Sequence, residues 1–371
     1  MPAVFIETFG CAANQADSEF IVGLLKRVGF ETAASTEAAD IVVLNTCIVK
    51  TPTENRIVRR MQDIAASGKP LVVAGCMSKT SQRRIESIAP HACIVGPDSL
   101  SHIADAAKAA LSGRKVIFVN DERADKPGLP RARRKKDLGI VPIAIGCLSE
   151  CSYCATKFAR GKLKSYPIDC IVRETEALVK DGCKVIWLTS EDNSAYGADI
   201  GTNLAELIGA VSKVPGDFKI RVGMMNPTYI RDEKLLTALI AAYKHPKVSK
   251  FLHVPVQSGS DKILRAMKRG YTVADFEKIV AAFRAEIQDV YISTDVIVGF
   301  PNETDDDFNA TVRLLGRVKP DKVNLSKFGA RPGTEASRLE QLPGKVVSDR
   351  SRAASAFLRA AATVRRPAAC A

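Results

Sequence analysis

The chain has 371 residues, 46% of them hydrophobic, which is enough for two packed domains. Its formal net charge of +13 and pI of about 9.3 favour a polyanionic partner, most simply nucleic acid. The N-terminal residues, with an acid at Glu7, lack the apolar core of a signal peptide, and no run approaches the length of a membrane span. We therefore expect a cytoplasmic protein without membrane contact, whose ten cysteines favour metal binding over disulfides.

The first third of the chain alternates buried strands with helices. Apolar, β-branched runs predict strands at 4–10, 40–46, 71–75 and 92–95, and helical stretches follow at 14–27, 53–66, 78–88 and 98–111. Such alternation is typical of a parallel sheet covered by helices. We expect residues 1–112 to form one α/β domain of this kind.

Three cysteines each come directly after one of these strands, namely Cys11, Cys47 and Cys76. Because the carboxyl ends of parallel strands meet at one edge of a sheet, the three thiols are expected on one rim. This placement predicts a metal site. The alternative is three buried structural cysteines, since free cysteine packs as a small hydrophobe.

Residues 113–137 read as a linker, which Pro127 and Pro130 help to keep extended. It ends in a basic run that is a candidate for RNA phosphate contacts: Arg131, Arg133, Arg134, Lys135 and Lys136. Further basic residues occur in the tail, including Arg359, Arg365 and Arg366. The alternative is that these charges are merely solvated.

From residue 139 the alternation of strands and helices starts again. We expect strands at 140–145, 184–189, 219–224, 250–256, 290–298 and 322–326, with helices between them. Six such units predict a partial (βα)6 barrel over residues 138–340, with functional side chains at the carboxyl ends of its strands. Residues 341–371 read as a basic helical tail.

The loop after the first of these strands holds Cys147, Cys151 and Cys154 in a C-x-x-x-C-x-x-C pattern. Three thiolates in a tight loop can bind three irons of a [4Fe–4S] cube, and no fourth cysteine lies nearby. One iron would remain open to a substrate. The alternatives are a zinc knuckle or scattered free thiols, but structural zinc usually takes four protein ligands.

This loop, with Tyr153 before its last cysteine, resembles that of the radical S-adenosylmethionine (SAM) superfamily. The layout of a spread cysteine trio before such a loop is similar to methylthiotransferases. Local motifs at 156–167, 187–192, 221–227, 253–260, 295–301 and 331–334 resemble the archaeal and eukaryotic branch, the tRNA N6-threonylcarbamoyladenosine methylthiotransferases. The resemblance spans most of residues 3–352.

The resemblance implies a flavodoxin-like domain followed by the radical SAM barrel, two [4Fe–4S] clusters, SAM, a tRNA substrate and a small flavodoxin- or ferredoxin-type electron donor. The cluster on the Cys147 trio would cleave SAM to a radical that attacks adenine C2 of the nucleoside at position 37, next to the anticodon. The cluster on the Cys11 trio would deliver sulfur, and a second SAM the methyl group. Candidate SAM contacts are Tyr153, Ser190, Glu191, Asp192, Gln257 and Ser258.

Two features depart from the family pattern. The glycine-rich motif that often binds the SAM amino group is absent after strand 184–189. In addition, only about nineteen residues follow Arg352, too few for the usual RNA-binding β-barrel, so either that domain is absent or the sequence is incomplete. The alternatives are action on another tRNA adenosine or a ribosomal protein, or a non-catalytic iron–sulfur protein that binds RNA.

Overall fold

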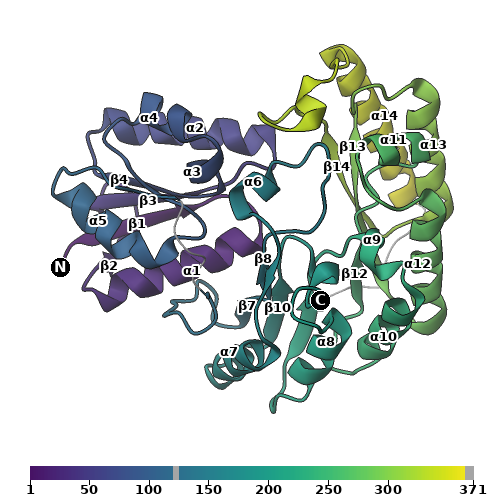
Figure 1. The fold of residues 1–371 in the computed structure, drawn as a ribbon, viewed down its shortest axis with the longest axis horizontal. Helices are drawn as coiled ribbons and strands as arrows, with labels where there is room; N and C mark the ends of the chain where they lie inside the picture. Colours follow the sequence, from purple (N-terminus) through teal and green to yellow (C-terminus); the bar gives the residue numbers. More distant parts are fainter. Residues whose placement is uncertain (120–124, 364–371) are drawn as a thin grey trace.

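The computed structural model describes residues 1–119 and 125–363, which form two α/β parts side by side (Figure 1). The first part has one parallel sheet with the strand order β2-β1-β3-β4-β5-β6. Its strands are β1 (Ala3–Thr8), β2 (Glu31–Thr32), β3 (Ile41–Thr46), β4 (Leu71–Gly75), β5 (Cys93–Val95) and β6 (Ile117–Phe118). The first five follow the flavodoxin-like order, as predicted.

Helices cover both faces of this sheet. Helices α1 (Ala12–Arg27) and α5 (Ile103–Leu111) pack on one face, and α2 (Thr51–Ala66), α3 (Cys76–Thr80) and α4 (Gln82–Ile88) pack on the other. The central strands β3 and β4 are therefore buried along their whole length. The helix predicted over 78–88 is in fact two helices, because Ser81 leaves helical geometry with φ −138° and ψ 35°.

The second part is the predicted partial barrel, built from two three-stranded parallel sheets. One sheet has the order β11-β10-β7 and the other β12-β13-β14, and a bridge between Ile220 and Val248 lies where they meet. The strands are β7 (Leu138–Pro142), β10 (Val185–Thr189), β11 (Lys219–Val222), β12 (Phe251–His253), β13 (Tyr291–Val298) and β14 (Lys322–Lys327). All six predicted strands are present.

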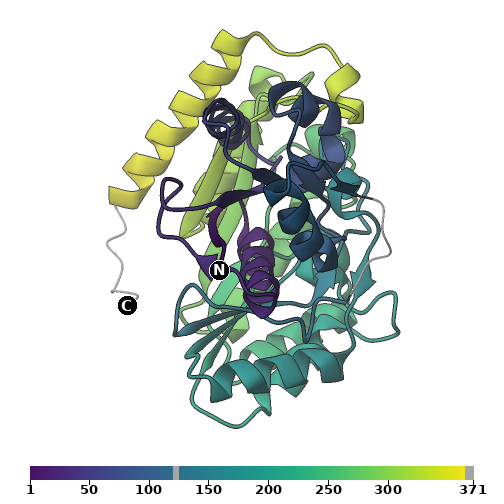
Figure 2. The ribbon, with the colours of Figure 1, turned by 90° about the vertical axis from the view of Figure 1, so that its left-hand side faces the viewer.

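Helices surround the barrel on its outer side: α7 (Ile168–Lys180), α8 (Leu204–Ser212), α10 (Glu233–Tyr243), α12 (Val273–Glu286) and α13 (Asp305–Val318). Short elements fill the loops, namely α6 (Thr156–Arg160), α9 (Pro227–Ile230) and α11 (Asp261–Ala266). The last helix, α14 (Gly344–Thr363), runs along the outside of the molecule (Figure 2). None of the helices in the described ranges is both long and apolar enough to cross a membrane.

The first barrel strand is shorter than predicted. It ends at Pro142, and residues Ala144–Ile145 form a separate strand, β8, which pairs antiparallel with β9 (Lys164–Ser165). The chain can turn at Gly146, whose φ is +82°. The loop that carries the second cysteine trio begins at this turn.

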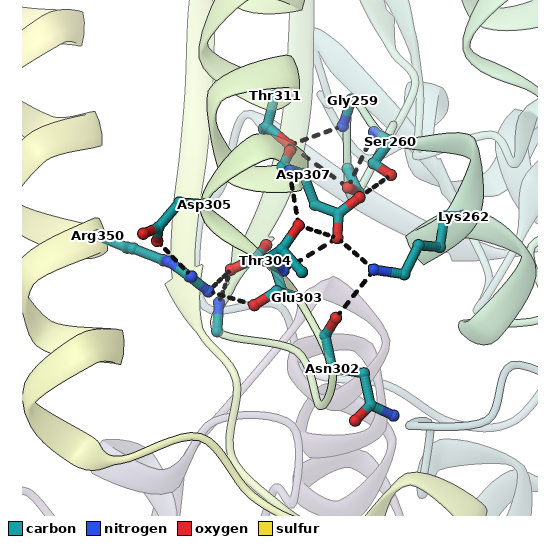
Figure 3. Close-up of polar contacts among 12 residues, drawn as sticks. Gly259, Ser260, Lys262, Asn302, Glu303, Thr304, Asp305, Asp307, Thr311 and Arg350 are labelled. Atoms are coloured by element: carbon teal, nitrogen blue, oxygen red, sulfur yellow. Dashed lines mark hydrogen bonds and ion pairs between the residues drawn. The ribbon is translucent and has the colours of Figure 1, made fainter.

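A polar cluster fixes the loops at the carboxyl ends of β12 and β13 (Figure 3). Asp307 accepts hydrogen bonds from Ser260 Oγ at 2.7 Å and Lys262 Nζ at 2.8 Å, which joins α13 to the loop after β12. Arg350 of α14 pairs with Glu303 at 2.8 Å and Asp305 at 2.7 Å. The last helix is thereby anchored to the loop after β13.

Replacing Arg350 by Met should lower the free energy of unfolding by about 3–5 kcal/mol, because Glu303 would remain buried without its charged partner. The matched control is Arg352→Met, which removes an ion pair with Asp349 in which the arginine is 78% exposed. That change should cost less than about 1 kcal/mol. Urea unfolding of both variants measures the difference, and equal losses would contradict the anchoring role of Arg350.

Candidate functional site

The first cysteine trio lies at the carboxyl edge of the N-terminal sheet. Cys11, Cys47 and Cys76 follow β1, β3 and β4, which are neighbours in the sheet. Cys47 and Cys76 are buried, while Cys11 is exposed. Burial raises the pKa of Cys76 to about 12, with a further rise from the nearby Cys11 and Cys47, and the positive charge of Arg160 opposes it. The structure thus brings the predicted trio together.

Asn14 and Gly10 hold the loops of this trio close to one another. The buried Asn14 donates from Nδ2 to Phe9 O at 2.7 Å and to Thr46 O at 2.8 Å, and so joins the ends of β1 and β3. Gly10 has φ +110°, and a Cβ there would lie 2.8 Å from Cys47 Sγ. Only glycine permits this approach.

The second trio lies in the loop after β8. Burial raises the pKa of Cys147 to about 12, with smaller contributions from Asp192 and Cys154. Cys151 and Cys154 are joined by a backbone hydrogen bond of 3.1 Å. A Cβ on Gly146 would lie 2.1 Å from the carbonyl oxygen of Lys162, so the residue before Cys147 has room only for hydrogen.

A buried arginine accompanies each trio. Arg269 is 7% exposed and donates to Cys151 Sγ at 3.2 Å, and Arg160, 1% exposed, lies beside the first trio. Metal-binding thiols are deprotonated, so each guanidinium compensates the negative charge that a bound iron–sulfur cluster brings. No three Cys, His, Asp or Glu side chains of the described ranges are arranged to hold a single metal ion. A cube binds each thiolate to a different iron and so requires a wider spacing. The residues present fit such a cluster.

The predicted SAM contacts differ in their surroundings. Glu191 accepts a hydrogen bond from Gly146 N at 2.9 Å, so it fixes the backbone directly before Cys147. Ser190 contacts Asn193 at 3.1 Å, and Ser258 is fully buried near Thr311. Tyr153 packs edge-on against Phe300, with ring centroids 6.5 Å apart.

Gln257 belongs to the backbone connection between β12 and β13. Its N–H donates to Asp295 O at 2.8 Å, and its φ of +69° lies in the left-handed region. The contacts that hold Gln257 in place are therefore made by its backbone.

Asp192, the third candidate at the end of β10, lies beside Asn226, which follows β11. Asp192 Oδ1 accepts from Ser194 N and Asn226 N, both at 3.0 Å. Its other oxygen, Oδ2, is buried without a hydrogen-bond partner in the part of the chain that the structure describes. Asn226 Nδ2 donates to Ser149 Oγ of the cysteine loop at 3.0 Å. Asn226 was not among the predicted contacts, and its place in the polar segment after β11 is the signal that could have identified it.

Two residues of the basic linker run are engaged within the molecule. Arg131 stacks over Phe20 at 4.4 Å and pairs with Glu174 at 3.1 Å. Arg133 pairs with Asp181. Through these contacts both arginines bind the linker to neighbouring parts of the molecule, and neither is a freely solvated surface charge.

The rest of the run, Arg134, Lys135 and Lys136, is exposed. It leads into the amino end of β7, at the opposite end of the strand from the cysteine loop. Arg359 of the tail is also exposed, whereas Arg365 and Arg366 lie outside the described residues.

Comparison with known proteins identifies the family. Residues 3–96 match the uncharacterized protein family UPF0004, and residues 141–315 match the radical SAM superfamily. A probable threonylcarbamoyladenosine tRNA methylthiotransferase of Pyrococcus horikoshii is 47% identical over 355 residues, which cover 95% of this chain and 83% of that protein. The chain belongs to the threonylcarbamoyladenosine tRNA methylthiotransferase family. The human family member is 36% identical over 357 residues and extends further, since the match covers 61% of it.

Solved structures support the same fold. The radical SAM methyltransferase TsrM from Kitasatospora setae has a TM-score of 0.63 at 16% identity, over 90% of this chain and 76% of that one. The cobalamin-dependent SAM radical enzyme OxsB has a TM-score of 0.60 at 12% identity, over 97% and 56%. The predicted family, fold class and enzyme class are confirmed. Family membership implies SAM and [4Fe–4S] clusters as cofactors.

Proposed function

We propose that this chain converts N6-threonylcarbamoyladenosine at position 37 of tRNA, next to the anticodon, into its 2-methylthio derivative. The observation that carries the proposal is the arrangement of the two cysteine trios, which lie at the carboxyl edges of two sheets and are linked by Arg160. When bound, the clusters and SAM supply radical cleavage of SAM, sulfur and a methyl group. We infer that the protein works in the cytoplasm, where a small flavodoxin- or ferredoxin-type protein provides electrons.

The residues of the chain have distinct tasks in this proposal. Cys147, Cys151 and Cys154 would hold the cluster at which SAM is bound and cleaved. Cys11, Cys47 and Cys76 would hold the auxiliary cluster that supplies sulfur. The protein otherwise supplies orientation and exclusion of water, as is usual where a cofactor performs the difficult chemistry.

Reconstitution with iron and sulfide under anaerobic conditions tests the proposal. The protein should hold about eight irons, four per cluster, and should form the methylthio nucleoside in tRNA, read by mass spectrometry. Replacing the Cys147 trio by Ala should halve the iron content and abolish SAM cleavage. Replacing the Cys11 trio should also halve the iron but leave some SAM cleavage.

Cys170→Ala is the control for these variants, because Cys170 lies on α7 outside both trios and should leave the iron content unchanged. Binding of zinc without iron would contradict the cofactor assignment. A reconstituted protein that holds both clusters but modifies no tRNA nucleoside would instead contradict the substrate assignment.

Asp192 is proposed to accept a hydrogen bond from the SAM amino group through Oδ2, the oxygen that lacks a partner. Asp192→Asn keeps the Oδ1 acceptor but removes the charge, so SAM affinity should fall about tenfold to a hundredfold, the equivalent of 1.5–3 kcal/mol for a charged hydrogen bond. Equilibrium binding of SAM to the reconstituted protein measures this. Asp232→Asn, at the exposed N-cap of α10, is the control, and an unchanged SAM affinity in Asp192→Asn would contradict the assignment.

The exposed residues Arg134, Lys135 and Lys136 are proposed to contact phosphates of the tRNA away from the modified base. Changing all three to Gln should weaken binding to all tRNAs alike and should reduce the slope of log affinity against log salt by up to about three. The control changes three exposed lysines on the outer helices of the barrel, Lys213, Lys234 and Lys244. Equal slopes in both variants would mean that the linker charges are merely solvated.

A further inference from the structure

Arg160 is a fully buried guanidinium between the two parts of the molecule. It ends α6, which lies between the N-terminal sheet and the barrel (Figure 1) and packs against α3. Its Nη1 pairs with Asp17 Oδ2 at 2.8 Å, and its Nη2 donates to Asn14 Oδ1 at 2.6 Å. Both partners lie on α1 of the N-terminal part, so Arg160 joins that part to the segment after the second trio.

On one side Arg160 reaches the first trio. Its partner Asn14 binds the backbone just before Cys11 and Cys47, and Cys76 Sγ lies 3.9 Å from Asn14 Oδ1. The guanidinium also acts electrostatically on Cys47 and Cys76. Cys47 and Cys76 thus have a buried positive charge beside them.

On the other side Arg160 reaches the second trio through Glu191. Arg160 Nε lies 3.5 Å from Glu191 Oε1, and Glu191 Oε2 accepts the hydrogen bond from Gly146 N. Gly146 immediately precedes Cys147. One guanidinium is therefore connected to the loops of both trios, by contacts with Asn14 and with Glu191.

We propose that Arg160 is a positioning residue shared by the two clusters, which sets the charge balance at the auxiliary cluster and, through Glu191, fixes the loop of the radical SAM cluster. This inference rests on the proposed function, since it requires both clusters to be present. A positive charge in a buried site stabilises the more negative, reduced form of its neighbour. Arg160 should therefore raise the reduction potential of the auxiliary cluster, one of the controls that charge and hydrogen bonding exert on such clusters.

A neighbouring lysine, Lys126, allows the specific role of Arg160 to be compared with the effect of another buried positive charge. Lys126 is also buried and pairs with the same carboxylate, Asp17. Within the described residues it bonds to Asp17 Oδ1 and, unlike Arg160, makes no hydrogen bond to Asn14, the residue beside Cys76. Because the interaction falls with distance, loss of Lys126 should destabilise the interface but shift the cluster potential less.

The test uses the full chain with Cys147, Cys151 and Cys154 changed to Ala, so that only the auxiliary cluster is present. Its reduction potential is measured by titration with dithionite and mediators, followed by electron paramagnetic resonance. Arg160→Gln should shift the potential downward, Arg160→Lys should remain near the parent value, and Lys126→Gln should shift it less than Arg160→Gln. A purely structural role of Arg160 would not produce this order.

Unchanged potential in an Arg160→Gln variant that still holds its cluster would overturn the inference, as would an equal shift in Lys126→Gln. If Arg160→Gln loses the cluster, Asp17→Asn decides the matter. That change removes a negative charge next to Arg160 and should raise the potential, and an unchanged or lower value would again overturn the inference. Absence of any iron in the parent would contradict the proposed function instead.

Discussion

The arrangement of this molecule depends on a buried ion network centred on Arg160, Asp17 and Glu191. Taking a guanidinium out of water costs several kcal/mol unless charges and hydrogen bonds replace its hydration. Here α1 supplies Asp17 and Asn14, and the strand end after β10 supplies Glu191. These contacts form only when the two parts of the chain lie against each other. The burial of Arg160 therefore fixes the position of one sheet relative to the other.

Two further arginines hold the same interface from other directions. Arg331, which follows β14, donates to Val49 O at 3.1 Å and Thr51 Oγ1 at 3.2 Å, close to Cys47. Arg131 of the linker lies near α1 and pairs with Glu174 of α7. Arginine suits this task because its planar fork binds several acceptors at once and stays charged when buried. The loops that carry the two trios are thus held from several sides.

Much of the fold and both trios could be predicted because they depend on simple rules. Buried parallel strands are continuous apolar runs, and a cysteine directly after such a strand must lie at the carboxyl edge of the sheet. The different surroundings of the adjacent residues Glu191 and Asp192 could not be predicted in this way. A turn has no fixed side-chain period, so the sequence does not reveal which of two adjacent carboxylates faces the cysteine loop and which supports it from behind.

The ion pairs of the linker arginines could not be predicted from the sequence for a different reason. Their partners, Glu174 and Asp181, come more than forty residues later in the chain, and nothing in a basic run distinguishes a charge that will be paired from one that will remain in solvent. The end of β7 at Pro142 was similarly obscured, because the apolar run continues through Ile145 although the strand does not.

The central claim is that two iron–sulfur clusters occupy the two trios with Arg160 between them. Anomalous diffraction at the iron absorption edge, from crystals of the anaerobically reconstituted protein, tests this claim most directly. The account predicts two separate iron peaks, one bonded to Cys11, Cys47 and Cys76 and the other to Cys147, Cys151 and Cys154. A single iron peak, or a disulfide between cysteines of either trio in protein that is active, would contradict it.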